Sequence, residues 1–150
     1  MARRSISLQT IDQTFEVARA FAHTLPADAV VCFFGGLGAG KTTFIKAVIS
    51  ELGNIPLNEI TSPTFNYCQS YEQIHHFDLY RLESADAFMA LGFDEYFHKG
   101  ICLIEWSERI LSIIPDGSVL VKIEVTGIHS RQISYETHPL SERHLSHLSS

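Results

Sequence analysis

The stretch Gly-Gly-Leu-Gly-Ala-Gly-Lys-Thr at residues 35–42 decides the fold, because it matches the phosphate-binding pattern G-x-x-x-x-G-K-[ST]. A short apolar run precedes it at residues 30–34, and residues 43–52 carry apolar side chains at helical spacing. A strand, a glycine loop and a helix in this order form the context in which the pattern binds phosphate. The sequence therefore predicts a unit that binds a nucleoside triphosphate.

Each residue type in this loop has a chemical reason. Glycines let the backbone N–H groups curl around phosphate oxygens, and the start of the following helix adds further unpaired N–H groups. Lys41 is expected to reach the β- and γ-phosphates, and the Thr42 hydroxyl is expected to contact Mg²⁺. The predicted phosphate-binding residues are Gly36, Leu37, Gly38, Ala39, Gly40, Lys41 and Thr42.

Composition is that of an ordinary globular chain. The 150 residues are 45% hydrophobic and 19% charged, which suits one domain with its own core. We expect that domain to span residues 1–136, followed by a polar, flexible tail at 137–150 that lacks periodicity. No apolar run approaches the roughly 20 residues of a membrane helix, and no signal-peptide core follows the basic start. A cytoplasmic protein is therefore expected. The net charge of −6 argues against a broad nucleic-acid-binding face.

Strand-like and helix-like segments alternate along the chain, which predicts an α/β fold. The expected strands are residues 5–8, 30–34, 67–71, 74–80, 101–104, 119–125 and 132–135. The expected helices are residues 11–24, 43–52, 84–91 and 108–114, the first of them capped by Thr10 with Gln13. Two consecutive strands after residue 66 indicate an antiparallel portion. The prediction is a three-layer sandwich of the P-loop NTPase type, with a mainly parallel sheet plus that antiparallel portion.

Two acidic residues end apolar strands, Asp78 and Glu105. In open α/β sheets ligands bind outside the carboxyl ends of the strands, so both carboxylates are expected to face the phosphates. Glu105 follows the more apolar strand and is the predicted Mg²⁺ residue, which leaves Asp78 for water positioning or a supporting role. The alternative for either residue is a carboxylate that caps the next turn.

Thr64 lies between the loop helix and the next strand, the place where a switch residue senses the γ-phosphate. The alternative is an ordinary proline turn around Pro63. His75 and His76 could suggest zinc, but zinc needs three or four ligands and Cys68 is too loosely placed to complete such a set. We therefore expect no zinc and two strand histidines on opposite faces.

Four motifs together resemble the TsaE family, also called YjeE, over about residues 5–135. They are Gly-Gly-Leu-Gly-Ala-Gly-Lys-Thr-Thr at 35–43, Ser-Pro-Thr-Phe at 62–65, His-Phe-Asp-Leu-Tyr-Arg at 76–81 and Ile-Glu-Trp at 104–106. The resemblance implies an ATPase that binds ATP or ADP with Mg²⁺ and is slow alone. It also implies the partners TsaB and TsaD, which place a threonylcarbamoyl group on adenosine 37 of tRNAs that read ANN codons. Contact with tRNA would be indirect, and no membrane is involved.

The resemblance also implies roles for individual residues. By motif match the catalytic set is Lys41, Thr64, Asp78, Glu105 and Trp106. Thr42 and Glu105 would serve the metal. Thr43 would lie near the nucleotide, and Thr10 and Arg131 are matched to the adenine pocket. One departure is Gly36, which stands where the family usually has Asp and puts any role of that carboxylate in doubt.

Two other functions compete. A P-loop small-molecule kinase generally carries lid arginines that grip the transferred phosphoryl group, and residues 43–77 contain none. A GTP-dependent switch usually carries an Asn-Lys-x-Asp signature for guanine, and this chain has no such signature. Both alternatives are therefore disfavoured by the sequence, with the kinase as the closer rival.

Overall fold

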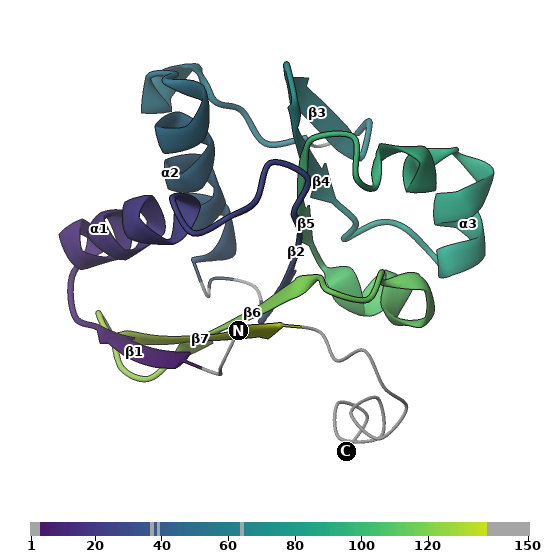
Figure 1. Ribbon diagram of the computed structural model, residues 1–150. Helices are drawn as coiled ribbons and strands as arrows, with labels where there is room; N and C mark the ends of the chain where they lie inside the picture. Colours follow the sequence, from purple (N-terminus) through teal and green to yellow (C-terminus); the bar gives the residue numbers. More distant parts are fainter. Residues whose placement is uncertain (1–3, 37, 39, 64, 138–150) are drawn as a thin grey trace.

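The computed structural model describes residues 4–36, 38, 40–63 and 65–137. Within these residues, seven strands form one sheet in the order β1-β7-β6-β2-β5-β4-β3 (Figure 1). The strands are β1 (Arg4–Leu8), β2 (Val30–Phe34), β3 (Cys68–Tyr71), β4 (Ile74–Asp78), β5 (Ile101–Glu105), β6 (Val119–Val125) and β7 (Arg131–Thr137). The helices are α1 (Ile11–Ala22), α2 (Lys41–Gly53) and α3 (Ala85–Ala90), with 3₁₀ turns η1 (Leu57–Glu59), η2 (Phe93–Tyr96) and η3 (Ser107–Ile113).

The sheet is parallel at its centre and antiparallel on both sides. Strands β6, β2, β5 and β4 pair in parallel, whereas β3 pairs antiparallel with β4, and β7 pairs antiparallel with both β6 and β1. The predicted α/β class, with parallel strands and an antiparallel portion, is confirmed. The antiparallel portion is larger than the β3–β4 pair, because β1 adds to the closing β6–β7 pair at the other edge.

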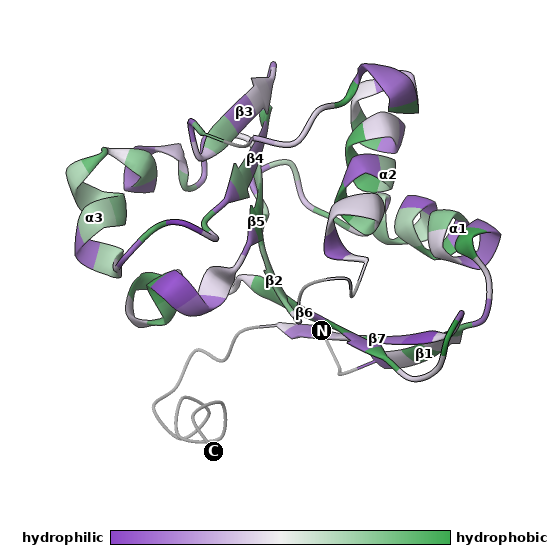
Figure 2. Ribbon diagram, turned by 180° about the vertical axis from the view of Figure 1, so that it is seen from behind, coloured by the Kyte–Doolittle hydropathy of each residue, from purple (hydrophilic) through white to green (hydrophobic). Residues whose placement is uncertain are grey.

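Helices cover both faces of the sheet, which gives the expected three layers. Helices α1 and α2 lie on one face, and α3 lies on the other with η2 and η3 (Figure 1). Each face has its own apolar core. Strand β5 is buried along its whole length, because a central strand of a parallel sheet is covered on both sides. Figure 2 accordingly shows hydrophobic residues along β2 and β5.

The predicted strand, loop and helix around the glycine motif are present. Strand β2 ends at Phe34 and α2 begins at Lys41. Gly40 precedes the helix with a φ of 96°, a left-handed conformation that glycine adopts without a Cβ clash. The short connection brings the N-terminus of α2 close to the end of a central strand, where ligands bind in this class of fold.

The cap of α1 is also as predicted. The Thr10 hydroxyl accepts a hydrogen bond of 3.1 Å from the Gln13 N–H, and the Gln13 amide oxygen accepts one of 2.6 Å from the Gln9 N–H. The helix ends at Ala22 rather than near Thr24. The chain turns there because Leu25 precedes a proline, and a residue before proline is disfavoured in the helical conformation.

Other boundaries also differ from the sequence prediction. Strand β4 ends at Asp78 and not at residue 80, because the Asp78 carboxylate accepts the Tyr80 N–H at 3.1 Å and turns the chain. The helix expected at residues 108–114 is the 3₁₀ segment η3, which begins at Ser107. Thr137 belongs to β7, so the predicted tail loses its first residue, and residues 138–150 lie outside the described residues. None of the described helices combines the length and apolar character that a membrane crossing requires.

Candidate functional site

Lys41 lies at the first position of α2, directly after the glycine loop. Its ammonium group donates a hydrogen bond of 2.5 Å to the Gly35 carbonyl and lies 3.6 Å from the centroid of the Trp106 ring. Only 5% of Lys41 is exposed, and this burial lowers its pKa, while neighbouring carboxylates, chiefly that of Glu108, oppose the shift. A desolvated cation at a helix N-terminus is suited to phosphate, which carries the opposite charge.

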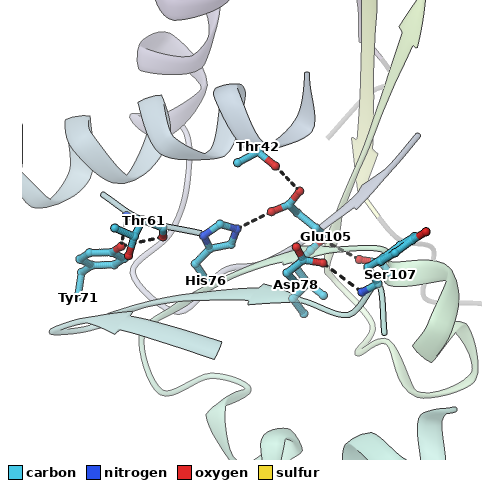
Figure 3. Close-up of polar contacts among 9 residues, drawn as sticks. Thr42, Thr61, Tyr71, His76, Asp78, Glu105 and Ser107 are labelled. Carbon is cyan, nitrogen blue, oxygen red and sulfur yellow. Dashed lines mark hydrogen bonds and ion pairs between the residues drawn. The ribbon is translucent and has the colours of Figure 1, made fainter. Parts of the chain in front are cut away.

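Thr42 and Glu105, the two predicted metal residues, are in direct contact. The Thr42 hydroxyl donates a hydrogen bond of 2.8 Å to Oε1 of Glu105 (Figure 3). The other carboxylate oxygen, Oε2, lies 2.7 Å from Nε2 of His76. Glu105 is 2% exposed, so nearly all of its polar surface is committed to these partners. Helix α2 and strands β4 and β5 thus meet at one carboxylate.

Sequence reasoning missed His76. A signal was present, because residues two apart on a strand share a face and His76 is two residues before Asp78. His75 points to the opposite face, as predicted, where Nδ1 lies 2.7 Å from the Ser70 hydroxyl and Nε2 lies 2.9 Å from the Lys99 carbonyl oxygen. Among the described residues, no group of three or more His, Cys, Asp or Glu side chains is arranged to hold a metal ion.

Asp78 stands beside Glu105 at the carboxyl edge of the sheet. The two residues are partners in the parallel register of β4 and β5, so the strands end together. Asp78 is partly buried, and this burial raises the pKa of its carboxyl, with the Glu105 charge adding to the rise. The capping alternative also holds for Asp78, whose carboxylate accepts the Tyr80 N–H. Turn formation uses one oxygen and leaves the other for a ligand.

Trp106 covers the site from the turn after β5. Its ring centroid lies 5.0 Å from that of Tyr80 and 5.9 Å from the guanidinium carbon of Arg109. Trp106 has a φ of 61°, which is uncommon for a bulky residue and marks backbone strain at a place where chemistry is expected. The strained turn directs the indole ring over Lys41.

A pocket of about 550 Å³ adjoins the N-terminus of α2. It brings together Thr10, Thr43 and Arg131, three residues that the family resemblance places near the nucleotide. Sequence reasoning missed Ile128 and His129 at the tip of the β6–β7 hairpin, because nothing in their sequence shows that the hairpin folds beside α1 and α2. The pocket is lined by Leu8, Gln9, Thr10, Ile11, Thr14, Gly40, Thr43, Phe44, Ile123, Ile128, His129 and Arg131.

Three predicted residues, Leu37, Ala39 and Thr64, lie outside the described residues. Gly38 has a φ of 78°, which favours glycine, whereas Gly36 has no such requirement. A Cβ added at Gly36 would meet no heavy atom within 4 Å. The glycine that replaces the usual family aspartate is therefore not demanded by packing within the described residues.

The three cysteines are poor candidates for chemistry. Burial raises the pKa of Cys32 and of Cys102 to about 12 and that of Cys68 to about 11. The thiolate is the reactive form of cysteine, so these thiols are inert at neutral pH. Cys32 and Cys102 are core residues.

Comparison with known proteins identifies the family. The family model described as "Threonylcarbamoyl adenosine biosynthesis protein TsaE" matches residues 8–133. The chain belongs to the TsaE family. The TsaE protein of Rickettsia felis is 37% identical over 134 residues, covering 87% of this chain and 78% of the relative. The TsaE protein of Bacillus subtilis is 35% identical over 129 residues, covering 83% and 79%.

The fold agrees with this assignment to TsaE. The crystal structure of YdiB from Bacillus subtilis matches with a TM-score of 0.74 and 29% sequence identity, covering 99% of this chain and 95% of that chain. The resemblance predicted from the four motifs is confirmed, as is the P-loop NTPase fold. The TsaE family takes part in tRNA threonylcarbamoyladenosine biosynthesis. Membership of this family favours a role in that pathway over the small-molecule kinase alternative.

Proposed function

We propose that this TsaE-family chain is a Mg²⁺-dependent ATPase, slow alone, that serves the complex forming N6-threonylcarbamoyladenosine at position 37 of tRNAs reading ANN codons. One observation carries the proposal. The Thr42 hydroxyl and the Glu105 carboxylate meet at 2.8 Å directly beside the buried cation of Lys41. These are the groups that a P-loop enzyme needs for phosphate and for metal.

In the proposed site, the phosphates of ATP bind at the N-terminus of α2. Lys41 gives up its bond to the Gly35 carbonyl and pairs with the β- and γ-phosphates, a stronger partner because it is charged. The backbone N–H groups of the glycine loop complete the contacts. Leu37 and Ala39 take part in this proposal through their backbone alone.

The donors around Glu105 fit Mg²⁺. A hydroxyl and a carboxylate are hard oxygen ligands, and Mg²⁺ in nucleotide sites uses one or two carboxylates together with phosphate oxygens and water. Thr42 and Glu105 would hold the ion on the protein side. A bound Mg²⁺ supplies neutralisation of the charge that develops on the phosphates.

The water that attacks the γ-phosphate needs an acceptor to orient it. Asp78 is the candidate, since its carboxylate stands next to Glu105 at the sheet edge and its partial burial favours a proton acceptor with a raised pKa. We assign Thr64 to sensing the γ-phosphate, as its motif position suggests. Trp106 shields Lys41 and keeps water away from the phosphates.

In the proposed site, the adenine base of ATP binds in the pocket beside Thr43. Its volume of about 550 Å³ and its mixture of apolar and polar residues suit a purine. Ile11 and Ile128 offer apolar surface to the flat faces of adenine, and Thr10 and Arg131 offer polar groups to its edge or to the ribose. A single ATP molecule would therefore run from this pocket to Lys41.

The partners in this proposal are TsaB and TsaD, with ATP turnover supporting repeated rounds of modification. The net charge of −6 supports indirect contact with tRNA, because a phosphate backbone is repelled by an acidic surface. The family assignment supports the pathway.

Two experiments test the proposal. Calorimetry with ATP and GTP, with and without Mg²⁺, is expected to give Mg²⁺-dependent ATP binding and much weaker GTP binding. Reconstitution with TsaB, TsaD, tRNA and threonylcarbamoyl-adenylate is expected to give multiple turnovers of modification only when this chain and ATP are present. Modification at an unchanged rate without the chain would refute its role in the complex.

A further inference from the structure

We propose that His76 is a positioning residue that fixes the orientation of the Glu105 carboxylate for the metal. This inference rests on the proposed function, in which Glu105 serves Mg²⁺. Among the hydrogen bonds and ion pairs of the described residues, His76 contacts neither the glycine loop nor Lys41, and its ring bonds to Glu105.

The carboxylate is held from two directions. His76 Nε2 lies 2.7 Å from Oε2, and Thr42 donates to Oε1 at 2.8 Å (Figure 3). The side chains of His76 and Glu105 are 0% and 3% exposed, so water does not compete for these bonds. A hydrogen bond in such surroundings is stronger and more directional than one in water.

Thr42 and His76, the two hydrogen-bond partners of Glu105, are expected to respond differently when a metal binds. The Thr42 hydroxyl is itself a proposed metal ligand, so it is expected to turn from Oε1 toward the cation. Oε1 then becomes free to face the metal. His76 has no such second role, and its bond to Oε2 keeps the carboxylate from rotating during the exchange. Positioning of this kind by a group behind a metal ligand is a general feature of metal sites.

The tautomer of His76 follows from its surroundings. Nδ1 is buried and has no hydrogen-bond partner within the described part of the chain. A proton on Nδ1 would therefore be an unsatisfied buried donor, and the Nε2 lone pair would then face the carboxylate oxygens. A proton on Nε2 avoids both costs and donates to Oε2. The structure thus assigns the Nε2–H form to His76.

His75 offers a matched control. It lies on the same strand and is also buried, but it faces the other side of the sheet and bonds to Ser70 and to the Lys99 carbonyl. Loss of its ring would disturb β4 to a similar extent without touching Glu105. A merely structural role for His76 would make the two histidines equivalent.

The first experiment is NMR on the nucleotide-free protein with ¹⁵N-labelled histidine at mildly alkaline pH. We expect two-bond correlations that show a protonated Nε2 and an unprotonated Nδ1 for His76. A proton on Nδ1 would overturn the inference. This measurement uses neither nucleotide nor metal, so it stands apart from the proposed ATPase activity.

The second experiment measures the Mg²⁺ concentration needed for half-maximal enhancement of ADP binding by calorimetry. His76→Phe is expected to raise it about 10- to 100-fold, the usual cost of removing a partner of a metal ligand. His76→Gln keeps an N–H donor at similar reach and is expected to restore most of the affinity. His75→Phe is expected to leave the midpoint near the wild-type value, and ADP binding without Mg²⁺ is expected to be equal in all variants.

The outcomes separate the two proposals. An unchanged Mg²⁺ midpoint in folded His76→Phe, or an equal loss in His75→Phe, would overturn the positioning role while leaving the ATPase proposal intact. If the ADP affinity of the wild-type protein does not depend on the Mg²⁺ concentration, the proposed function is refuted, and with it the metal role of His76. If thermal unfolding shows that His76→Phe does not fold, His76→Gln and the tautomer measurement decide the question.

Discussion

The ammonium group of Lys41 lies against the ring of Trp106, 3.6 Å from its centroid. A cation over an indole face is stabilised by about 2 kcal/mol or more when it is desolvated. In the proposed function, phosphate competes with this contact and with the Gly35 carbonyl for the Lys41 ammonium group. We therefore expect nucleotide binding to change the surroundings of the indole ring.

Nucleotide binding is expected to change tryptophan fluorescence. Trp106 is the single tryptophan of the chain, and withdrawal of Lys41 from its ring alters the local field.

Lys41→Ala should weaken ATP binding strongly, because it removes the cation over the phosphates. A fluorescence titration measures both effects. Lys46→Ala on the same helix is the control, and an unchanged ATP affinity in Lys41→Ala would contradict the role of Lys41.

Glu105→Gln is expected to lower Mg²⁺-dependent ATP hydrolysis by at least about 100-fold, the usual cost of removing a preorganised charge. The glutamine amide keeps the shape of the side chain. However, Thr42 and His76 both donate hydrogen bonds to the Glu105 carboxylate, so the amide NH₂ group would face another donor and lose that hydrogen bond. Steady-state phosphate release measures the rate. The exposed Glu59→Gln should leave the rate nearly unchanged, and full activity of Glu105→Gln would exclude the metal assignment.

Asp78→Asn is expected to raise the thermal stability of the nucleotide-free protein modestly at pH 7. Burial raises the pKa of Asp78 in the folded state, so its charge costs stability once the pH exceeds the unfolded value of about 4. The cost appears as the pH rises from there through the raised folded pKa, and it is absent at lower pH. The Tm difference between variant and wild type should therefore grow from pH 3.5 to pH 7. A difference that shrinks over this range would reverse the assigned sign.

Arg131→Ala is expected to weaken ATP binding while leaving binding of inorganic tripolyphosphate unchanged. The Arg131 guanidinium lines the pocket, and it donates to the Gly127 carbonyl at 3.5 Å across the turn that carries Ile128 and His129. Competition titrations with the two ligands separate base contacts from phosphate contacts. Lys122→Ala, an exposed change on β6, is the control. Equal losses for both ligands would place Arg131 at the phosphates instead.

Gly100→Ala is expected to destabilise the fold by several kcal/mol. Gly100 has a φ of 97°, and a Cβ there would lie 2.2 Å from the Gln73 carbonyl oxygen, which belongs to rigid backbone. Gly36→Ala, where the added Cβ meets nothing within 4 Å, should be neutral or stabilising by about 0.4–1 kcal/mol. Urea unfolding of both variants measures the difference. Comparable stability of the two variants would refute the steric argument.

The fold could be predicted to a large extent because its signals are local. The glycine motif, the apolar run of β5 and the Thr10 cap each depend on residues that are close in the sequence. Boundaries such as the end of β4 were wrong, because the hydrogen bond of Asp78 to Tyr80 ends the strand within an otherwise suitable pattern. The acids at the strand ends were found because parallel strands place their carboxyl ends at one edge.

The sequence by itself determined the family, through four motifs, and it predicted which residues carry phosphate and metal chemistry. Only the tertiary structure decided which of them touch. His76 meets Glu105 because β4 lies beside β5, and Ile128 reaches the pocket because β7 lies between β6 and β1. Alternation along a strand tells which face a side chain takes, but the strand next to it is chosen by packing across the whole sheet.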